Sequence, residues 1–149
     1  MSDSFLRLIP VDPTFVPTTE AIGRARTLLR SMVLDQIVTS DTSDEVRFVD
    51  QGENFEQLRC PFCEAELDSE WWKDAMDRAY ETHFENLKVR VPCCGRETSL
   101  NDLDYRGPAG FARFLLEVEN PSGDELEAQY IAQLEGVLGT KLRQIRTKI

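Results

Sequence analysis

Apolar residues along the chain follow the two spacings that distinguish strands from helices. Apolar positions that alternate with polar ones predict strands over residues 4–11, 44–50, 86–91 and 111–119. Apolar positions three and four residues apart predict helices over 19–33, from Asp68 or Ser69 to Tyr80, and from Ser122 to Leu138. The chain therefore mixes both element types, as in an α+β protein.

Capping residues set the expected ends of these helices. Thr18 stands directly before the first helix, where a hydroxyl can accept a hydrogen bond from a free backbone N–H. Ser122 and Glu125 form the S-x-x-E pattern of a capping box before the last helix, and Gly139 can end it. The last segment, KLRQIRTKI, alternates poorly, which leaves a final strand open.

The order of elements suggests an internal symmetry. The first 50 residues read strand, helix, strand, and the last 40 residues repeat that order. Two such halves can combine into one sheet with both helices on the same face, the ferredoxin-like arrangement. Residues 51–106 would then be an insertion within a single domain, 1–149. The alternative is a looser α+β domain without this symmetry.

The charge of the chain limits its partners. Among 149 residues the formal net charge is −10, with 41% apolar and 30% charged residues. This excess of acids disfavours general nucleic-acid binding, which needs a surplus of Lys and Arg against phosphates. The one electrostatic feature in favour of nucleic acid is the basic tail Lys141, Arg143, Arg146 and Lys148. We expect a protein partner that meets an acidic surface.

The N-terminal sequence bears on the compartment. The start, MSDSFLRLIP, lacks the basic region and long apolar run of a signal peptide. No stretch approaches the roughly 18 apolar residues of a membrane helix. We therefore expect a cytoplasmic protein without membrane contact. In a reducing cytosol, clustered cysteines indicate metal or redox chemistry more than disulfides.

Four cysteines form two pairs with the features of metal knuckles. Cys60 and Cys63 have C-P-x-C spacing, which aims two thiolates at one point. A structural zinc ion needs four ligands, so Cys93 and Cys94 must complete the set. In a regular second knuckle the first cysteine would stand at Val91, and Cys94 matches the second. Cys93 occupies the position between them.

Three arrangements of these residues stay open. In the first, Cys60, Cys63, Cys93 and Cys94 all bind one Zn²⁺ ion, which is structural because no position remains for water. In the second, His83 replaces Cys93 as the fourth ligand. In the third there is no metal, and the thiols are buried or Cys60 and Cys63 form a redox pair.

The motifs CPFC (60–63) and PCCG (92–95) together resemble a zinc ribbon with a helix inserted between the knuckles. The longer run VPCCGRETSLNDLDYRGPAGFARF also resembles small bacterial proteins of uncharacterised activity that carry P-C-C-G followed by T-S-L-N-D-L and an aromatic-rich strand. This resemblance covers about residues 58–118. It implies a bacterial origin and a metal site, and it implies no activity.

Catalytic motifs are absent from the sequence. It contains no G-x-S-x-G, no P-loop and no G-x-G-x-x-G, and its single histidine is His83. We therefore expect a non-enzymatic, zinc-stabilised module that binds another protein through its acidic surface or through Trp71 and Trp72. The alternatives are a nucleic-acid accessory protein of transcription or translation, and a thiol redox or metal-responsive protein.

Overall fold

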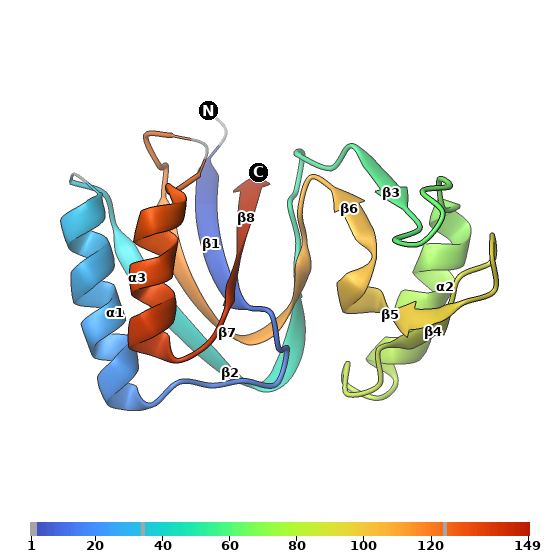
Figure 1. Ribbon diagram of the computed structural model, residues 1–149, viewed down its shortest axis with the longest axis horizontal. Coiled ribbons are helices and arrows are strands. Elements are labelled where there is room, and N and C mark those ends of the chain that lie inside the picture. Colours follow the sequence, from blue (N-terminus) through green and yellow to red (C-terminus); the bar gives the residue numbers. More distant parts are fainter. Residues whose placement is uncertain (1–2, 34, 124) are drawn as a thin grey trace.

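The computed structural model describes residues 3–33, 35–123 and 125–149. The two ends of the chain build a four-stranded antiparallel sheet, and α1 and α3 cover one of its faces (Figure 1). Among the residues in these ranges, no helix has both the length and the apolar character that crossing a membrane requires. The elements of this part are β1 (Ser4–Pro10), α1 (Thr19–Met32), β2 (Val38–Val49), β7 (Gly110–Glu119), α3 (Ala128–Leu138) and β8 (Leu142–Lys148).

The sheet confirms the ferredoxin-like arrangement of two strand-helix-strand halves. Its strand order is β2-β7-β1-β8, so the first strand of each half lies in the middle and the second strand at an edge. One core cluster fills the space between the sheet and the two helices. Its fully buried members include Leu8, Ala25, Leu29, Phe114, Leu116, Val118 and Leu134.

Helix α1 begins where the sequence predicts. The side chain of Thr18 accepts a hydrogen bond of 3.1 Å from the backbone N–H of Ala21. Helix α3 begins later than predicted, at Ala128, and no side chain caps it, so the capping box of Ser122 and Glu125 is wrong. The chain before α3 is held by a tertiary contact, because the side-chain amide of Gln144 in β8 bonds both the N–H and the carbonyl of Leu126.

Strand β2 starts six residues before the predicted range of 44–50. It is an edge strand, its pairing with β7 shifts register between Thr42 and Arg47, and much of its first half is exposed. An edge strand with a polar face lacks the apolar alternation that reveals a strand in a sequence. The weakly patterned tail likewise forms a full strand, β8, next to β1.

The segment between β2 and β7 forms its own small structure beside the sheet (Figure 1). It contains two short antiparallel pairs, β3 with β6 and β4 with β5. A second core cluster lies here and includes Phe111 of β7, whose ring centroid is 5.1 Å from that of Phe48 in β2. The elements are β3 (Gln57–Arg59), α2 (Ser69–Tyr80), β4 (Lys88–Arg90), β5 (Glu97–Ser99), η1 (Leu100–Asp102) and β6 (Asp104–Arg106).

Asn101 of η1 joins this segment to the sheet. Its side-chain N–H donates to the carbonyl of Val11 at 3.0 Å, and its Oδ1 accepts from the N–H of Phe111 at 2.9 Å. Arg143 of β8 donates from Nη1 to the carbonyls of Asn101 and Ala109, both at 3.0 Å. Burial lowers the pKa of Arg143, whereas the nearby Asp102 raises it. These bonds are long-range, so the sequence could not show them.

Two glycines near the end of α3 give a matched test of backbone conformation. Gly139 ends the helix with φ +79°, whereas Gly136 lies within the helix, and a Cβ at either position meets no atom within 4 Å. We expect Gly139→Ala to lower the free energy of unfolding by about 1 kcal/mol, because alanine is strained at positive φ. Gly136→Ala should raise it by roughly 0.5–1 kcal/mol. Urea unfolding measures both, and shifts of the same sign would contradict the assignment.

Candidate metal centre

The first cysteine pair lies in a tight turn directly after β3. The N–H of Cys60 donates to the carbonyl of Ala65 at 2.8 Å, and the N–H of Glu64 donates back to the carbonyl of Cys60 at 3.1 Å. The backbone at Glu64 has φ +63°, which closes the turn. The N–H of Phe62 points to Cys60 Sγ at 3.4 Å. The turn therefore directs backbone donors towards a sulfur, which favours its thiolate form.

The second pair lies in a turn with the same backbone pattern, between β4 and β5. The N–H of Val91 donates to the carbonyl of Arg96 at 3.0 Å, and the N–H of Gly95 donates to the carbonyl of Val91 at 2.9 Å. Gly95 has φ +73°, which matches the positive φ of Glu64 in the first turn. Val91 thus stands at the backbone position of Cys60, and both side chains are 0% exposed. This is the correspondence that the sequence spacing predicts.

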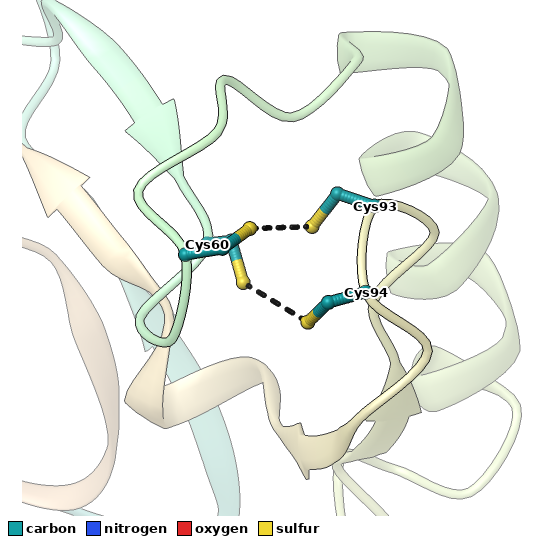
Figure 2. Close-up of side chains that lie close together, drawn as sticks. Cys60, Cys93 and Cys94 are labelled. Atoms are coloured by element: carbon teal, nitrogen blue, oxygen red, sulfur yellow. Dashed lines mark hydrogen bonds between the residues drawn. The ribbon is translucent and has the colours of Figure 1, made fainter.

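Cys93 supplies the thiol that Val91 lacks. It occupies the position of Phe62 in the first turn, and its Sγ lies 3.4 Å from Cys63 Sγ. Cys94 Sγ lies 3.9 Å from Cys60 Sγ. Figure 2 shows Cys93 and Cys94 extending from their loop towards the turn that carries Cys60. The four sulfurs all lie within 4.8 Å of one another.

The distances between the sulfurs fit a tetrahedral metal site. Four metal–sulfur bonds of about 2.3 Å in a tetrahedron separate their sulfurs by about 3.8 Å. The contacts of 3.4 and 3.9 Å lie near that value, and they greatly exceed the bond of about 2.05 Å in a disulfide. All four cysteines are free thiols in the structure. The arrangement is therefore able to hold one metal ion among four sulfurs.

His83 lies apart from this group. It follows α2 with φ +57°, and its Nδ1 is 3.4 Å from a carboxylate oxygen of Glu45 in β2. Among the described residues, the group of side chains able to share a metal ion consists of the four cysteines without His83. The structure thus favours the four-cysteine arrangement over the one in which His83 replaces Cys93.

The four thiols influence one another's protonation. Burial raises the pKa of Cys60, but hydrogen bonds from the backbone at Cys63 and Phe62 and from neighbouring thiols outweigh it and lower the pKa to about 7. Burial, together with hydrogen bonds and the negative charges of Cys60 and Cys63, raises the pKa of Cys93 to about 12. Thiolates this close repel one another. A divalent cation among them removes that penalty as it displaces the protons.

The two tryptophans of α2 support the cluster beneath the cysteines. Both are half-buried against it, as their adjacent positions on a helix require. The indole N–H of Trp72 donates to the hydroxyl of Tyr105 at 3.3 Å, and that hydroxyl donates to the carbonyl of Leu100 at 2.7 Å. Burial raises the pKa of Tyr105 to about 12, despite this bond from Trp72 and the charge of Arg143. In the sequence Tyr105 stands between Asp104 and Arg106, and no pattern singles it out.

Comparison of the chain with protein-family models, with curated proteins and with solved structures found no match. The chemistry of the site therefore rests on the residues and their geometry. Cys60, Cys63, Cys93 and Cys94 form a possible metal site within the segment between β2 and β7.

Proposed function

We propose that the protein is a non-enzymatic interaction module whose inserted segment, residues 51–106, is stabilised by one structural Zn²⁺ ion. The observation that carries the proposal is the convergence of four sulfurs within 4.8 Å from two matching turns. Thiolate sulfurs in a tetrahedral set favour zinc among the common divalent ions. Four protein ligands leave no open position for a substrate or a water molecule, so the ion has a structural role.

Exposed aromatic side chains support an interaction surface on the inserted segment. Phe55, Phe62 and Tyr80 are the large aromatic residues among the exposed apolar side chains of the described chain, and all three belong to this segment. Phe62 lies at the tip of the first turn, where the guanidinium of Arg96 from the second turn is 5.3 Å from its ring centroid. Aromatic and Arg side chains are enriched at protein interfaces. The net charge of −10 favours a partner with a basic surface.

The nucleic-acid alternative has weaker support. Its main feature, the basic tail, is strand β8 of the sheet and does not form a separate arm. The guanidinium of Arg143 donates to the carbonyls of Asn101 and Ala109, at the interface between the sheet and the inserted segment. A cation used in this way is not available to a phosphate.

The metal content tests the first part of the proposal. Protein purified without added metal should contain about one zinc ion per chain by elemental analysis, since one tetrahedral site needs one ion. Titration of the native protein should find four unreactive thiols, which become reactive after a chelator removes the metal. A zinc content far below one per chain, or a different metal in its place, would contradict the assignment.

Recovery of partners from cell extract tests the interaction. We expect the double variant Phe62→Ala and Tyr80→Ala to lose a protein that the unaltered chain retains, because both side chains are exposed and belong to the inserted segment. Ile37→Ala is the matched control, since Ile37 is an equally exposed apolar residue next to β2. If the double variant still retains the protein, or if Ile37→Ala alone loses it, the exposed aromatic residues do not form the interaction surface. Retention of nucleic acid at low salt would favour the alternative.

A further inference from the structure

A pocket of about 710 Å³ lies between the end of β2, the loop that follows it, β3 and the start of α2. None of the four cysteines lines it, so it is separate from the candidate metal centre. Its volume lies within the range of pockets that bind small molecules, roughly 300–1,000 Å³. The pocket is therefore large enough to hold a small-molecule ligand.

Four aromatic side chains contribute to the walls of this pocket: Phe48, Phe55, Trp72 and Tyr105. The ring centroid of Phe48 is 5.7 Å from that of Trp72 and 6.2 Å from that of Tyr105, and the rings are tilted. The polar ends of Trp72 and Tyr105 are already bonded to each other. These residues therefore offer aromatic surface to a ligand, and aromatic surface attracts both apolar groups and cations.

Phe55 stands out because it is 52% exposed. Its backbone is fixed, since its N–H donates to the carbonyl of Gly52 at 3.3 Å. Gly107 allows this close approach, because a Cβ there would collide with the carbonyl of Asn54. A ligand that covers this ring removes apolar surface from water, and this burial favours binding.

The charged residues of the pocket are mostly acidic. Four carboxylates line it, and the single ammonium among the lining residues is that of Lys73, which lies 4.0 Å from Glu70 on the same helix. The carboxylates are those of Asp50, Glu56, Glu66 and Asp68. Carboxylates beside aromatic rings favour a positively charged ligand and repel an anion.

Gln51 adds a polar group at the wall. It is only 5% exposed, and its backbone carbonyl accepts hydrogen bonds from the N–H groups of Asn54 and Lys148. Gln51 is one of the residues that line the pocket. The carbonyl oxygen of its side-chain amide can accept a hydrogen bond from an N–H donor of a ligand.

We propose that this pocket binds a small organic cation, in which an ammonium or guanidinium group is attached to an apolar body of about the size of one aromatic ring. The body packs against Phe48, Phe55 and Trp72, and the cationic group lies among the carboxylates and the amide of Gln51. The pocket shares no residue with the four-cysteine group, so this assignment does not depend on the proposed zinc.

Phenethylamine and 3-phenylpropionate test the sign of the charge, because they share a phenyl ring and a two-carbon chain but carry opposite charges. Each is titrated into the protein as purified, and the tryptophan fluorescence is recorded. We expect phenethylamine to bind one site with a Kd of about 1 mM or tighter, which is reasonable for a ligand of this size. The anion should bind at least about tenfold more weakly, and added salt should weaken phenethylamine binding. Equal affinities, or no saturable binding, would overturn the proposal.

Matched variants test the place of binding. Phe55→Ala should weaken phenethylamine binding by about fivefold, the usual scale of one aromatic–cation contact. Ile37→Ala is the control, because Ile37 is an exposed apolar residue that lies outside the pocket. In the same way Glu66→Gln should weaken binding, whereas Glu85→Gln, which lies outside the pocket, should not. All four substituted side chains are exposed, so folding is retained. Equal effects within either pair would place the ligand elsewhere. If a lysine-containing peptide saturates the site and phenethylamine does not, the pocket is a contact for another protein, and the small-cation proposal is overturned.

Discussion

Cys63→Ser is expected to unfold the inserted segment, residues 51–106, even though Cys63 is an exposed side chain. Without a metal ion this substitution would be a surface change worth about 0.5 kcal/mol or less. With a zinc ion bound by four thiolates it removes one ligand, and the binding free energy of a structural zinc, roughly 10–16 kcal/mol, is largely folding free energy. We therefore expect the free energy of unfolding to fall by several kcal/mol, about as much as for Cys60→Ser.

We expect the inserted segment to depend on the proposed zinc because its own secondary structure is sparse. Strands β3, β4, β5 and β6 have three residues each, and they pair only two at a time. Isolated two-stranded pairs are marginally stable in water. The second core cluster supplies apolar burial, and the two cysteine turns also meet through their sulfurs and through the contact between Arg96 and Phe62.

Comparison of Cys60→Ser with Cys63→Ser separates the metal from ordinary packing. Cys60 is fully buried in the second cluster, so its replacement costs stability with or without a metal. The exposed Cys63 tests the metal alone. Urea unfolding followed by tryptophan fluorescence reports on the segment through Trp71 and Trp72, and elemental analysis reports the zinc content. If Cys63→Ser unfolds at the same urea concentration as the unaltered protein, the thiols do not hold a structural ion.

The sequence predicts those features that depend on local pattern. The strands that pack both apolar faces or alternate regularly, such as β1 and β7, and the cap at Thr18 lie where the pattern places them. The correspondence of Val91 with Cys60 also follows from spacing, since a knuckle is a local turn whose backbone hydrogen bonds repeat. These features need no knowledge of distant residues.

The features that the sequence could not show depend on contacts between distant residues. The polar first half of β2 becomes a strand because β7 offers it a backbone partner, and the start of α3 is fixed by Gln144 from β8 and not by the capping box at Ser122. The pairing of His83 with Glu45 is equally non-local. Spacing alone left His83 and Cys93 as alternatives, and the tertiary structure favours Cys93.

Asn101→Leu is expected to be strongly destabilising, although Asn101 lies outside the candidate metal centre. Leucine keeps the branched shape and the number of side-chain heavy atoms but removes one partner from each of three groups: the N–H of Phe111, the carbonyl of Val11 and the Arg143 guanidinium. Each unsatisfied buried group costs about 1–3 kcal/mol, and a charged group costs more. We expect a loss of about 3–5 kcal/mol in the free energy of unfolding.

The tight packing around Asn101 prevents the structure from relaxing to avoid this loss. A Cβ at Gly110 would lie 2.7 Å from Arg143 Nη1 and 3.1 Å from Asn101 Oδ1, so the strand approaches the joint too closely for a water molecule to enter at that point. Arg143 is also held by the carbonyl of Ala109 and by the backbone carbonyl of Asn101, both of which leucine would keep. The guanidinium therefore stays in place with one acceptor missing.

Two further variants distinguish a joint between the sheet and the inserted segment from a local effect. Arg143→Met removes the guanidinium but keeps an apolar stem, and it should cost less than Asn101→Leu because Asn101 retains its bonds to Val11 and Phe111. Asn86→Leu, at an exposed site whose side chain bonds only the nearby N–H of Lys88, should cost about 1 kcal/mol or less. Hydrogen exchange should show early opening at Phe111 in Asn101→Leu alone. Equal costs for Asn101→Leu and Asn86→Leu would mean that the sheet and the inserted segment are held together by apolar packing around Phe48 and Phe111, with Asn101 contributing little.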